Sequence, residues 1–258
     1  MIISTVLVSS NLNQDYYLSF PIVHKLLARQ NIRCVLILVT YDSYLPSELG
    51  EYQSDIILYN VDKKMGEHYP VFVAQNIRLL WCGIMDSEIG ENAIMISDVD
   101  MHILDISYFS KKVENVDNKY FVNCGLLPDR LSNDEYYMCY NIATPTIWRE
   151  IFKVTTKEEV DKKLWEWWEK VDYSFDNKYR SKCRGFHHDQ QQLFKHLENY
   201  NYKLIFNKDF HRLEGSFTIS KYIDMLNTNN YTDLIPLKPY SRYANVYNIV
   251  YNKTIFSK

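Results

Sequence analysis

The feature that most constrains this chain is a series of short apolar runs separated by segments of helical periodicity. Residues 2–8 and 34–40 are almost wholly apolar and rich in β-branched side chains, as strands buried on both faces must be. Residues 16–30 lie between them and carry Leu18, Ile22 and Leu26 near helical spacing. A strand, a helix and a second buried strand predict a βαβ unit, the repeating unit of parallel sheets.

The alternation continues through the first hundred residues and loosens after Asp105. Strands are predicted at residues 55–59 and 93–97, with a helix at residues 71–85 between them. Later segments predict a strand at 137–143, helices at 145–152, 157–171 and 188–200, a loop at 172–185 and a short strand at 203–207. We therefore expect an α/β protein with a mostly parallel central sheet flanked by helices, built as one domain over residues 1–258.

The composition argues against several classes of protein. The formal net charge is -3 and no long run of Lys or Arg is present, so nucleic acid is not an expected partner. The five cysteines form no CxxC pair, which favours a reducing compartment, the cytoplasm, over a disulfide scaffold or a zinc site. The apolar start lacks a basic segment and is too short to cross a bilayer, so we expect no transmembrane segment. Attachment to a membrane surface and the oligomeric state stay open.

Two carboxylates follow directly on the predicted strand at residues 93–97. Asp98 and Asp100 are two residues apart, so an extended chain places both on roughly the same side. In an open parallel sheet, ligands bind beyond the carboxyl ends of the strands, where loops and helix N-termini converge. Two neighbouring carboxylates repel each other unless a cation joins them, and oxygen ligands favour Mg²⁺ or Mn²⁺. An ordinary acidic turn is the alternative interpretation of the same residues.

Residues 94–104 resemble the DxD region of GT-A glycosyltransferases. In that family the carboxylates hold a divalent metal against the pyrophosphate of a nucleotide sugar, which implies that Asp98 and Asp100 are metal ligands and that Asp98 also contacts the donor. Residues 74–81 resemble the helix before the DxD strand, which implies that Arg78 binds the donor through its fixed fork of N–H groups. A surface arginine on an amphipathic helix is the alternative. The resemblance covers residues 2–215 at the level of motifs and implies a single GT-A, Rossmann-like domain.

Two later segments extend the resemblance. Residues 136–143, followed by Trp148, are similar to the strand and helix that line the sugar pocket in family-eight-like enzymes, which implies that Tyr140 and Asn141 face the sugars. Residues 185–194 resemble an acidic motif at a helix N-terminus, which implies catalytic roles for Asp189 and Gln190. An Asp in a first helical turn is also a good helix starter, because it complements the helix dipole.

The remaining predicted ligands are a late histidine and the polar residues that follow the first two strands. Many GT-A enzymes supply a late His to the metal, which implies that role for His211, with Arg212 as an alternative functional residue near the diphosphate. Hydrogen bonds to the base and ribose of the donor are expected from Ser9, Ser10, Asn11, Thr40 and Asp42.

The resemblance implies metal-dependent transfer of a sugar from a nucleotide diphosphate, most simply a UDP-sugar, to a hydroxyl of a glycan or other acceptor. Residues 1–105 would bind the nucleotide sugar, and residues 106–258 would bind the acceptor and include a C-terminal extension. In an inverting enzyme Asp189 would deprotonate the acceptor, and in a retaining enzyme it would position the substrate. The Asp189-Gln190 pair favours retention slightly.

Three alternatives have some support in the sequence. Phosphatases of the haloacid dehalogenase type also place DxD after a buried strand, but here Met101 follows and no matching lysine and acidic pair lies downstream. Sugar nucleotidylyltransferases share the sheet, but their glycine-rich basic loop is missing after Val8. The third alternative is an inactive carbohydrate-binding or scaffold domain. Neither GxGxxG nor GxxxxGK[ST] is present, which argues against dinucleotide and P-loop sites.

Overall fold

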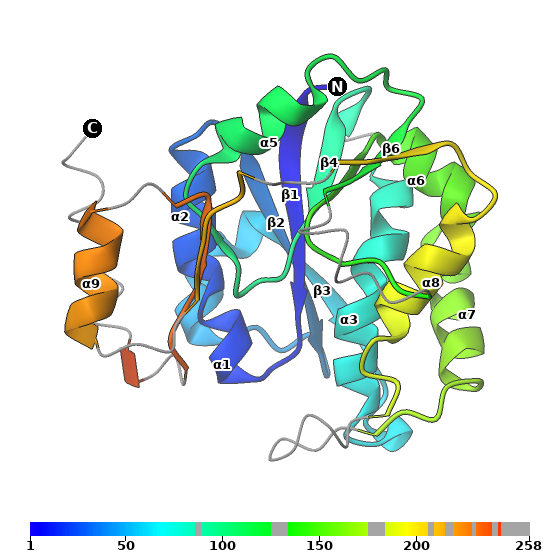
Figure 1. Ribbon diagram of the computed structural model, residues 1–258. Helices are drawn as coiled ribbons and strands as arrows, with labels where there is room; N and C mark the ends of the chain where they lie inside the picture. Colours follow the sequence, from blue (N-terminus) through cyan, green and yellow to red (C-terminus); the bar gives the residue numbers. More distant parts are fainter. Residues whose placement is uncertain are drawn as a thin grey trace.

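The computed structural model describes residues 1–85, 89–124, 134–174, 184–205, 209–214, 219–228, 231–238 and 242–243. Within these residues the centre of the molecule is a seven-stranded sheet with helices on both faces (Figure 1). In spatial order its strands are β3 (Ile56–Asn60), β2 (Arg33–Thr40), β1 (Ile3–Ser10), β4 (Ala93–Ile96), β7 (Asn141–Ala143), β6 (Phe121–Asn123) and β8 (Tyr202–Leu204).

The strands of this sheet run in one direction except for β7. β1 pairs in parallel with β2 and β4, β2 with β3, and β6 with β8, whereas β7 is antiparallel to both β4 and β6. The chain moves outward from β1 through β2 to β3 and then returns to β4 on the other side of β1. The strand order therefore reverses between β1 and β4, and such a switch point opens a crevice at the carboxyl ends of the strands.

Helices cover both faces of the sheet because each helix buries an apolar stripe against it (Figure 1). Local signals fix where several of them begin. α2 and α3 each have a proline in the first turn, where a missing N–H costs nothing, and α7 begins with a capping box between Thr156 and Glu159. On one face lie α3 (Tyr69–Trp81), α6 (Pro145–Phe152), α7 (Lys157–Trp168) and α8 (His188–Leu197), and on the other α1 (Gln14–Tyr17), α2 (Phe20–Ala28) and α5 (Ile106–Val113).

A second, smaller sheet joins the C-terminal part of the chain to the segment after β4. β10 (Asp233–Ile235) pairs antiparallel with β5 (His102–Ile103) and parallel with β9 (Arg212–Glu214). Tyr222 of α9 (Ile219–Thr228) packs on the apolar side chains beside this sheet. The pairing brings residues 231–238 next to the chain that follows Asp100, although well over a hundred residues separate them in sequence.

The structure confirms the expected fold class, an α/β domain with a mostly parallel central sheet. The strand predicted at residues 34–40 lies within β2, the strand predicted at 93–97 corresponds to β4, and the helix predicted at 145–152 is α6. The strands predicted at 2–8 and 55–59 are β1 and β3, each displaced by one or two residues. These segments were predictable because burial on both faces leaves a continuous apolar run.

Two predicted elements are wrong. Residues 16–30 form two helices, α1 and α2, because the chain turns at Leu18 and Ser19 and α2 begins again with Pro21 in its first turn. The strand predicted at 137–143 contains only Asn141–Ala143, because the Asn141 amide donates to the carbonyl oxygens of Tyr137 (2.9 Å) and Met138 (2.7 Å) and holds a turn before the strand. Side-chain hydrogen bonds of this kind compete with strand pairing.

Other boundaries differ by a few residues. The helix predicted at 71–85 divides into α3 and the 3₁₀ turn η3 (Cys82–Ile84), and the helices predicted to end at residues 171 and 200 end at Trp168 and Leu197. The predicted strand at 203–207 is β8, with residues 206–208 outside the described part. Most of the predicted loop at 172–185, including Cys183, also lies outside it. The described cysteines are all buried: Cys34, Cys82, Cys124 and Cys139.

Candidate active site

A cavity of about 620 Å³ lies at the switch point, beyond the carboxyl ends of β1 and β4. Its walls come from the end of β1 and the turn after it, residues 98–101 after β4, one side of α3 and the start of α8. The turn at residues 137–139 and two cations from the C-terminal part, Arg212 and Lys238, complete the lining. A crevice of this size suits a small organic ligand with a few polar anchoring groups.

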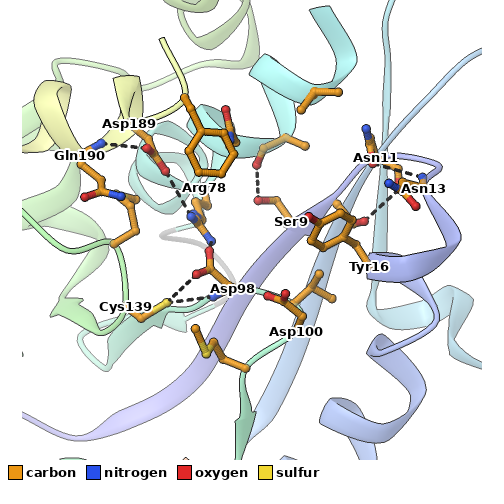
Figure 2. A pocket seen from close by; sticks show the side chains of 18 of the residues that line it. Ser9, Asn11, Asn13, Tyr16, Arg78, Asp98, Asp100, Cys139, Asp189 and Gln190 are labelled. Carbon is orange, nitrogen blue, oxygen red and sulfur yellow. Dashed lines mark hydrogen bonds and ion pairs between the residues drawn. The ribbon is translucent and has the colours of Figure 1, made fainter. Parts of the chain in front are cut away.

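Arg78 joins three elements at the buried end of this cavity (Figure 2). It is only 5% exposed, and its Nη1 donates to the carbonyl oxygen of Ser97 (2.9 Å) and to the Asp98 carboxylate. Its Nη2 donates to Asp189 Oδ2 at 3.2 Å. Desolvation lowers the pKa of Arg78, but the two carboxylates more than offset that effect and hold the pKa above its usual value. One fixed guanidinium therefore links α3, the end of β4 and the start of α8.

The two carboxylates that share Arg78 have opposite pKa shifts. Desolvation raises the pKa of Asp98, but Arg78 and a hydrogen bond from the Cys139 thiol (3.0 Å) lower it, and the result lies below the usual value. For Asp189, desolvation is strong enough to raise the pKa to about 6 in spite of Arg78. The Asp189 side chain is only 5% exposed, and the neighbouring Asp98 anion raises the pKa of Asp189 further, whereas Asp98 gains a hydrogen bond from Cys139 that favours its charged form. Asp189 can thus exchange a proton near neutral pH.

The start of α8 fixes the position of Asp189. Gly185 has a φ of 68°, and a Cβ there would lie 2.8 Å from a methyl group of Val171, so the close approach requires glycine. The chain then enters α8, where the Asp189 carboxylate accepts a hydrogen bond from the Gln190 backbone N–H (2.9 Å). The Asp189 carboxylate therefore points into the cavity from a helix N-terminus, toward Arg78 (Figure 2).

Asp100, the second carboxylate of the DxD turn, also lines the cavity but has a different partner. Lys238 Nζ is 2.6 Å from Asp100 Oδ2, and the same ammonium lies 4.0 Å from the centre of the Tyr16 ring. The side chains of Asp100 and Lys238 are 15% and 28% exposed, so this ion pair is in contact with solvent. Desolvation lowers the pKa of Lys238, but Asp100 and Tyr16 raise it, and the pKa lies above its usual value.

A third cation, Arg212, lies at the edge of the cavity and is held by a buried carboxylate. Arg212 donates to both oxygens of the fully buried Asp233 (Nε at 3.0 Å to each, and Nη2 at 2.7 Å to Oδ2), and the Tyr140 hydroxyl also donates to Asp233. Desolvation lowers the pKa of Arg212, but Asp233 more than offsets it, so that the pKa is raised. Since Arg212 lines the cavity, this buried cluster fixes a permanent positive charge at its edge.

The structure brings most of the predicted site residues together. Among those predicted as donor or metal ligands, Asp98, Asp100 and Arg78 line the cavity. Ser9 and Asn11 line it from β1, although the Ser9 hydroxyl donates to the Ala74 carbonyl oxygen and Asn11 Oδ1 accepts from the Asn13 N–H (3.1 Å) (Figure 2). The predicted catalytic pair Asp189 and Gln190 also lines the cavity.

Thr40, the last residue of β2, and Asp42, which follows the strand, lie away from the cavity lining. The Thr40 hydroxyl donates to the Tyr44 carbonyl oxygen at 2.7 Å and is buried beneath the turn that follows the strand. Asp42 is exposed and pairs with Lys63 at 2.7 Å. β2 is one strand further from the switch point than β1, so its end does not reach the described cavity.

Three more predicted ligands are not in the cavity lining. Tyr140 is 1% exposed and packs on Phe109 while it donates to Asp233, and the Asn141 amide is used by the turn before β7. His211 is exposed and is not among the residues that line the cavity. In the described part of the chain no group of three or more His, Cys, Asp or Glu side chains is arranged to hold a metal ion, so the expected third ligand from His211 is not assembled.

Several lining residues had no signal in the sequence. Lys238 follows a three-residue strand that pairs with a segment more than a hundred residues away, and Cys139 lies in a turn within an apolar run that predicted a strand. Tyr16 was only the first residue of the helix predicted at residues 16–30. Arg212 was predicted only as an alternative to His211, and the buried Asp233 that holds it was not predicted. These residues become functional candidates only through tertiary contacts.

In the described ranges, no helix is both long and apolar enough to cross a bilayer. No protein-family model and no curated protein sequence matches the chain. The comparison with solved structures, in contrast, finds glycosyltransferases. The apo form of the glycosyltransferase GlyE of Streptococcus pneumoniae TIGR4 matches with a TM-score of 0.50 and 12% identity, over 97% of this chain and 62% of that one. This chain thus spans less than two thirds of the length of GlyE.

Two further solved structures have lower TM-scores. The galactosyltransferase LgtC, in complex with donor and acceptor sugar analogues, matches at 12% identity with a TM-score of 0.45 over 95% of each chain. Mouse xyloside xylosyltransferase 1 matches at 8% identity with a TM-score of 0.48, over 91% of this chain and 98% of that one. The sheet order and the match to GlyE together show that this chain has the GT-A fold of glycosyltransferases.

Proposed function

We propose that this chain is a glycosyltransferase that moves a sugar from a UDP-sugar to a hydroxyl group of a glycan or other acceptor. The observation that carries the proposal is the cavity at the switch point of a GT-A fold, where Arg78 links Asp98 to Asp189 and Asp100 lies beside them. Two parts of this proposal follow only from the resemblance of residues 94–104 to the DxD region of GT-A enzymes and stay predictions. These are the choice of a uridine nucleotide and the division at residue 105 into donor and acceptor halves.

The charges of the cavity support a divalent cation that enters together with the diphosphate. Four carboxylates line the cavity against three cations, and one of these cations, Arg212, already neutralises the buried Asp233. A diphosphate would add further negative charge to a partly buried site, which is costly without a compensating cation. The charged residues that line the cavity are Glu67, Arg78, Asp98, Asp100, Asp189, Arg212 and Lys238.

The donor set at the DxD turn fits Mg²⁺ or Mn²⁺, because such ions commonly bind through one or two carboxylates together with substrate phosphates. Asp100 would be the main protein ligand, since Lys238 contacts only one of its oxygens. Asp98 would contribute less, because Arg78 and Cys139 each engage one of its oxygens. When bound, the metal would stabilise the negative charge that grows on the leaving diphosphate.

The residues of the chain itself would orient the reacting groups. Arg78 holds Asp98 and Asp189 in fixed positions, so that little reorganisation is needed during the reaction. We favour a retaining reaction, in which Asp189 and Gln190 position the sugar and the acceptor while the leaving phosphate assists the acceptor hydroxyl. In an inverting reaction Asp189, with its pKa of about 6, would accept the proton of that hydroxyl.

The phosphatase alternative receives less support from the geometry. In that class the first Asp of the motif is the nucleophile, and hydrogen bonds that lower the pKa of a carboxylate also make it a weaker nucleophile. Both Asp98 oxygens already accept hydrogen bonds, one from Arg78 and one from the Cys139 thiol. Asp98 is therefore better suited to a structural and electrostatic role than to attack on phosphorus.

The test is ligand binding followed by turnover. Thermal unfolding of the chain would be measured with a panel of nucleotides and nucleotide sugars, each with and without Mn²⁺. A ligand at about a hundred times its dissociation constant should stabilise the native state by about 2.7 kcal/mol. We expect UDP and a UDP-sugar to stabilise only with the metal, and the product anomer, observed by NMR, to retain the donor configuration.

Three outcomes would contradict the proposal. Indifference of the melting temperature to every nucleotide would exclude a nucleotide-sugar site. Release of phosphate from simple esters would favour the phosphatase. Binding of a UDP-sugar with neither hydrolysis nor transfer to any acceptor would favour the inactive binding domain.

A further inference from the structure

Lys238 pairs with the carboxylate that is best placed to bind a metal. Its Nζ lies 2.6 Å from Asp100 Oδ2, and both side chains line the cavity. The other cation of the DxD turn, Arg78, is engaged by Asp98 and Asp189. In the described structure the negative charge of Asp100 is therefore neutralised by an ammonium group that the chain itself supplies.

An ammonium and a divalent ion on one carboxylate would repel each other strongly. Two charges about 4 Å apart interact by several kcal/mol near a protein surface, and the metal carries two. Asp98 is not a better ligand for the ion than Asp100, since Arg78 and Cys139 each donate to one of its oxygens. A divalent ion can reach Asp100 with full ligation only if Lys238 withdraws.

Lys238 has a second favourable contact within the same cavity. Its ammonium lies 4.0 Å from the centre of the Tyr16 ring, a distance typical of a cation–π interaction. A Lys side chain is a flexible four-carbon stem with a compact charge, so the ammonium can leave Asp100 without movement of the backbone. A diphosphate in the cavity would give the displaced ammonium a new anion to face.

We infer that Lys238 acts as an internal competitor of the divalent cation at Asp100, which makes metal binding depend on the arrival of a diphosphate. The inference rests on the proposed function, because it assumes that metal and nucleotide share this cavity. It assigns to Lys238 a coupling role: the metal alone binds weakly, and the metal and nucleotide bind strongly together. Such coupling is reciprocal, so the metal must raise the affinity for the nucleotide by the same factor.

The experiment measures Mn²⁺ binding to the whole chain by electron paramagnetic resonance of the free ion, first without and then with UDP. Lys238→Met keeps the length of the side chain and removes its charge, whereas Lys238→Arg keeps the charge. Lys63→Met is the matched control, because it removes a lysine from an ion pair with Asp42 that lies outside the cavity. Circular dichroism and the melting temperature report whether each variant folds.

We expect Lys238→Met to bind Mn²⁺ roughly tenfold more tightly than the unmodified chain in the absence of nucleotide. Lys238→Arg and Lys63→Met should behave like the unmodified chain. Asp100→Asn, added to Lys238→Met, should remove the gain. In the unmodified chain UDP should raise Mn²⁺ affinity by a larger factor than in Lys238→Met.

Equal Mn²⁺ affinity of Lys238→Met and the unmodified chain would overturn the inference, as would equal enhancement by UDP in the two proteins. The proposed function fails separately. If no nucleotide binds while Lys238→Met still gains Mn²⁺ affinity through Asp100, the competitor role stands and the glycosyltransferase assignment falls. If UDP and Mn²⁺ bind together but Lys238→Met changes nothing, the assignment stands and the competitor role falls.

Discussion

The two sides of the DxD turn are built differently. On the Asp98 side, a buried Arg78 holds two carboxylates with several hydrogen bonds, in contact with α3 and α8. On the Asp100 side, a single, partly exposed ion pair joins Asp100 to Lys238, which lies on a C-terminal segment that reaches the cavity through a small second sheet. The Asp98 side is therefore held in a fixed position, whereas Asp100 can exchange Lys238 for another cation.

The largest expected effect would test the fixed side. Arg78→Met should lower the free energy of unfolding by about 3–5 kcal/mol, because it leaves two carboxylates at the buried end of the cavity without their cation. Urea denaturation followed by circular dichroism measures the change. Lys238→Met is the matched comparison on the open side and should cost far less. A similar loss in both variants would show that the two sides do not differ in rigidity.

The second prediction concerns activity on the open side. Asp100→Asn should reduce metal-dependent transfer or donor hydrolysis by about 10²–10³-fold, the usual cost of removing one electrostatic contributor to a transition state. Its stability should change less than that of Arg78→Met, since one ion pair is lost and Lys238 keeps its contact with the Tyr16 ring. Initial rates over a range of Mn²⁺ concentrations, together with the melting temperature, separate the two effects. Near-normal turnover would remove Asp100 from the proposed site.

A pH titration sharpens the contrast within the fixed side. The folded-state pKa of Asp189 is about 6, above its unfolded value, so the native state binds the proton more tightly than the unfolded chain. The Asp189 contribution to stability is therefore fully present below the unfolded pKa and is lost as the pH rises through about 6. Asp98, with its lowered pKa, contributes in the opposite sense and loses its stabilisation as the solution becomes acidic.

The Asp189→Asn variant reports the first contribution, because groups that do not contact Asp189 or Arg78 cancel in the difference. The stability of the unmodified chain relative to this variant should fall by about 2–3 kcal/mol between pH 4 and pH 7. Urea denaturation at each pH provides the measurement. A difference that does not vary with pH would mean that Asp189 titrates in the folded chain as it does in the unfolded one.

The smallest expected effect concerns the buried cluster of Tyr140, Arg212 and Asp233. Tyr140→Phe should cost roughly 1.5 kcal/mol, the low end for a hydrogen bond to a charged group. Asp233 keeps three contacts with Arg212 in this variant, so its buried charge is not left alone. Urea denaturation gives the value. If Tyr140→Phe lowered the free energy of unfolding as much as Arg78→Met, the Asp233 cluster, and not Arg78, would be the main stabilising group of the site.

The parts of the fold that the sequence predicted are those in which burial and periodicity coincide. β2 and β4 are buried along their whole apolar runs or nearly so, and α6 begins with a capping threonine and a proline at its first turn. The short strands were not predictable in the same way. β6, β9 and β10 have three residues each and pair with distant segments, so no local periodicity marks them.

The residues of the candidate site fall into the same two groups, those marked by local sequence features and those that depend on distant contacts. Asp98, Asp100 and Asp189 were predictable because each stands at a strand end or a helix start, where local rules place ligand-binding groups. Tyr140, Asn141 and His211 were chosen by similarity of segments, and the structure places them outside the cavity lining. A one-residue change of register or a turn before a strand is enough to move a side chain from the cavity to the core.

The sequence by itself determined the α/β sheet and the carboxylates at its switch point, because apolar runs and strand ends are local features of the chain. Tertiary structure alone decided which cation meets which carboxylate. Arg78 reaches Asp189 across 111 residues, and Lys238 reaches Asp100 across 138. The energy of such pairs depends on distance and on exclusion of water, and neither quantity is set by position along the chain.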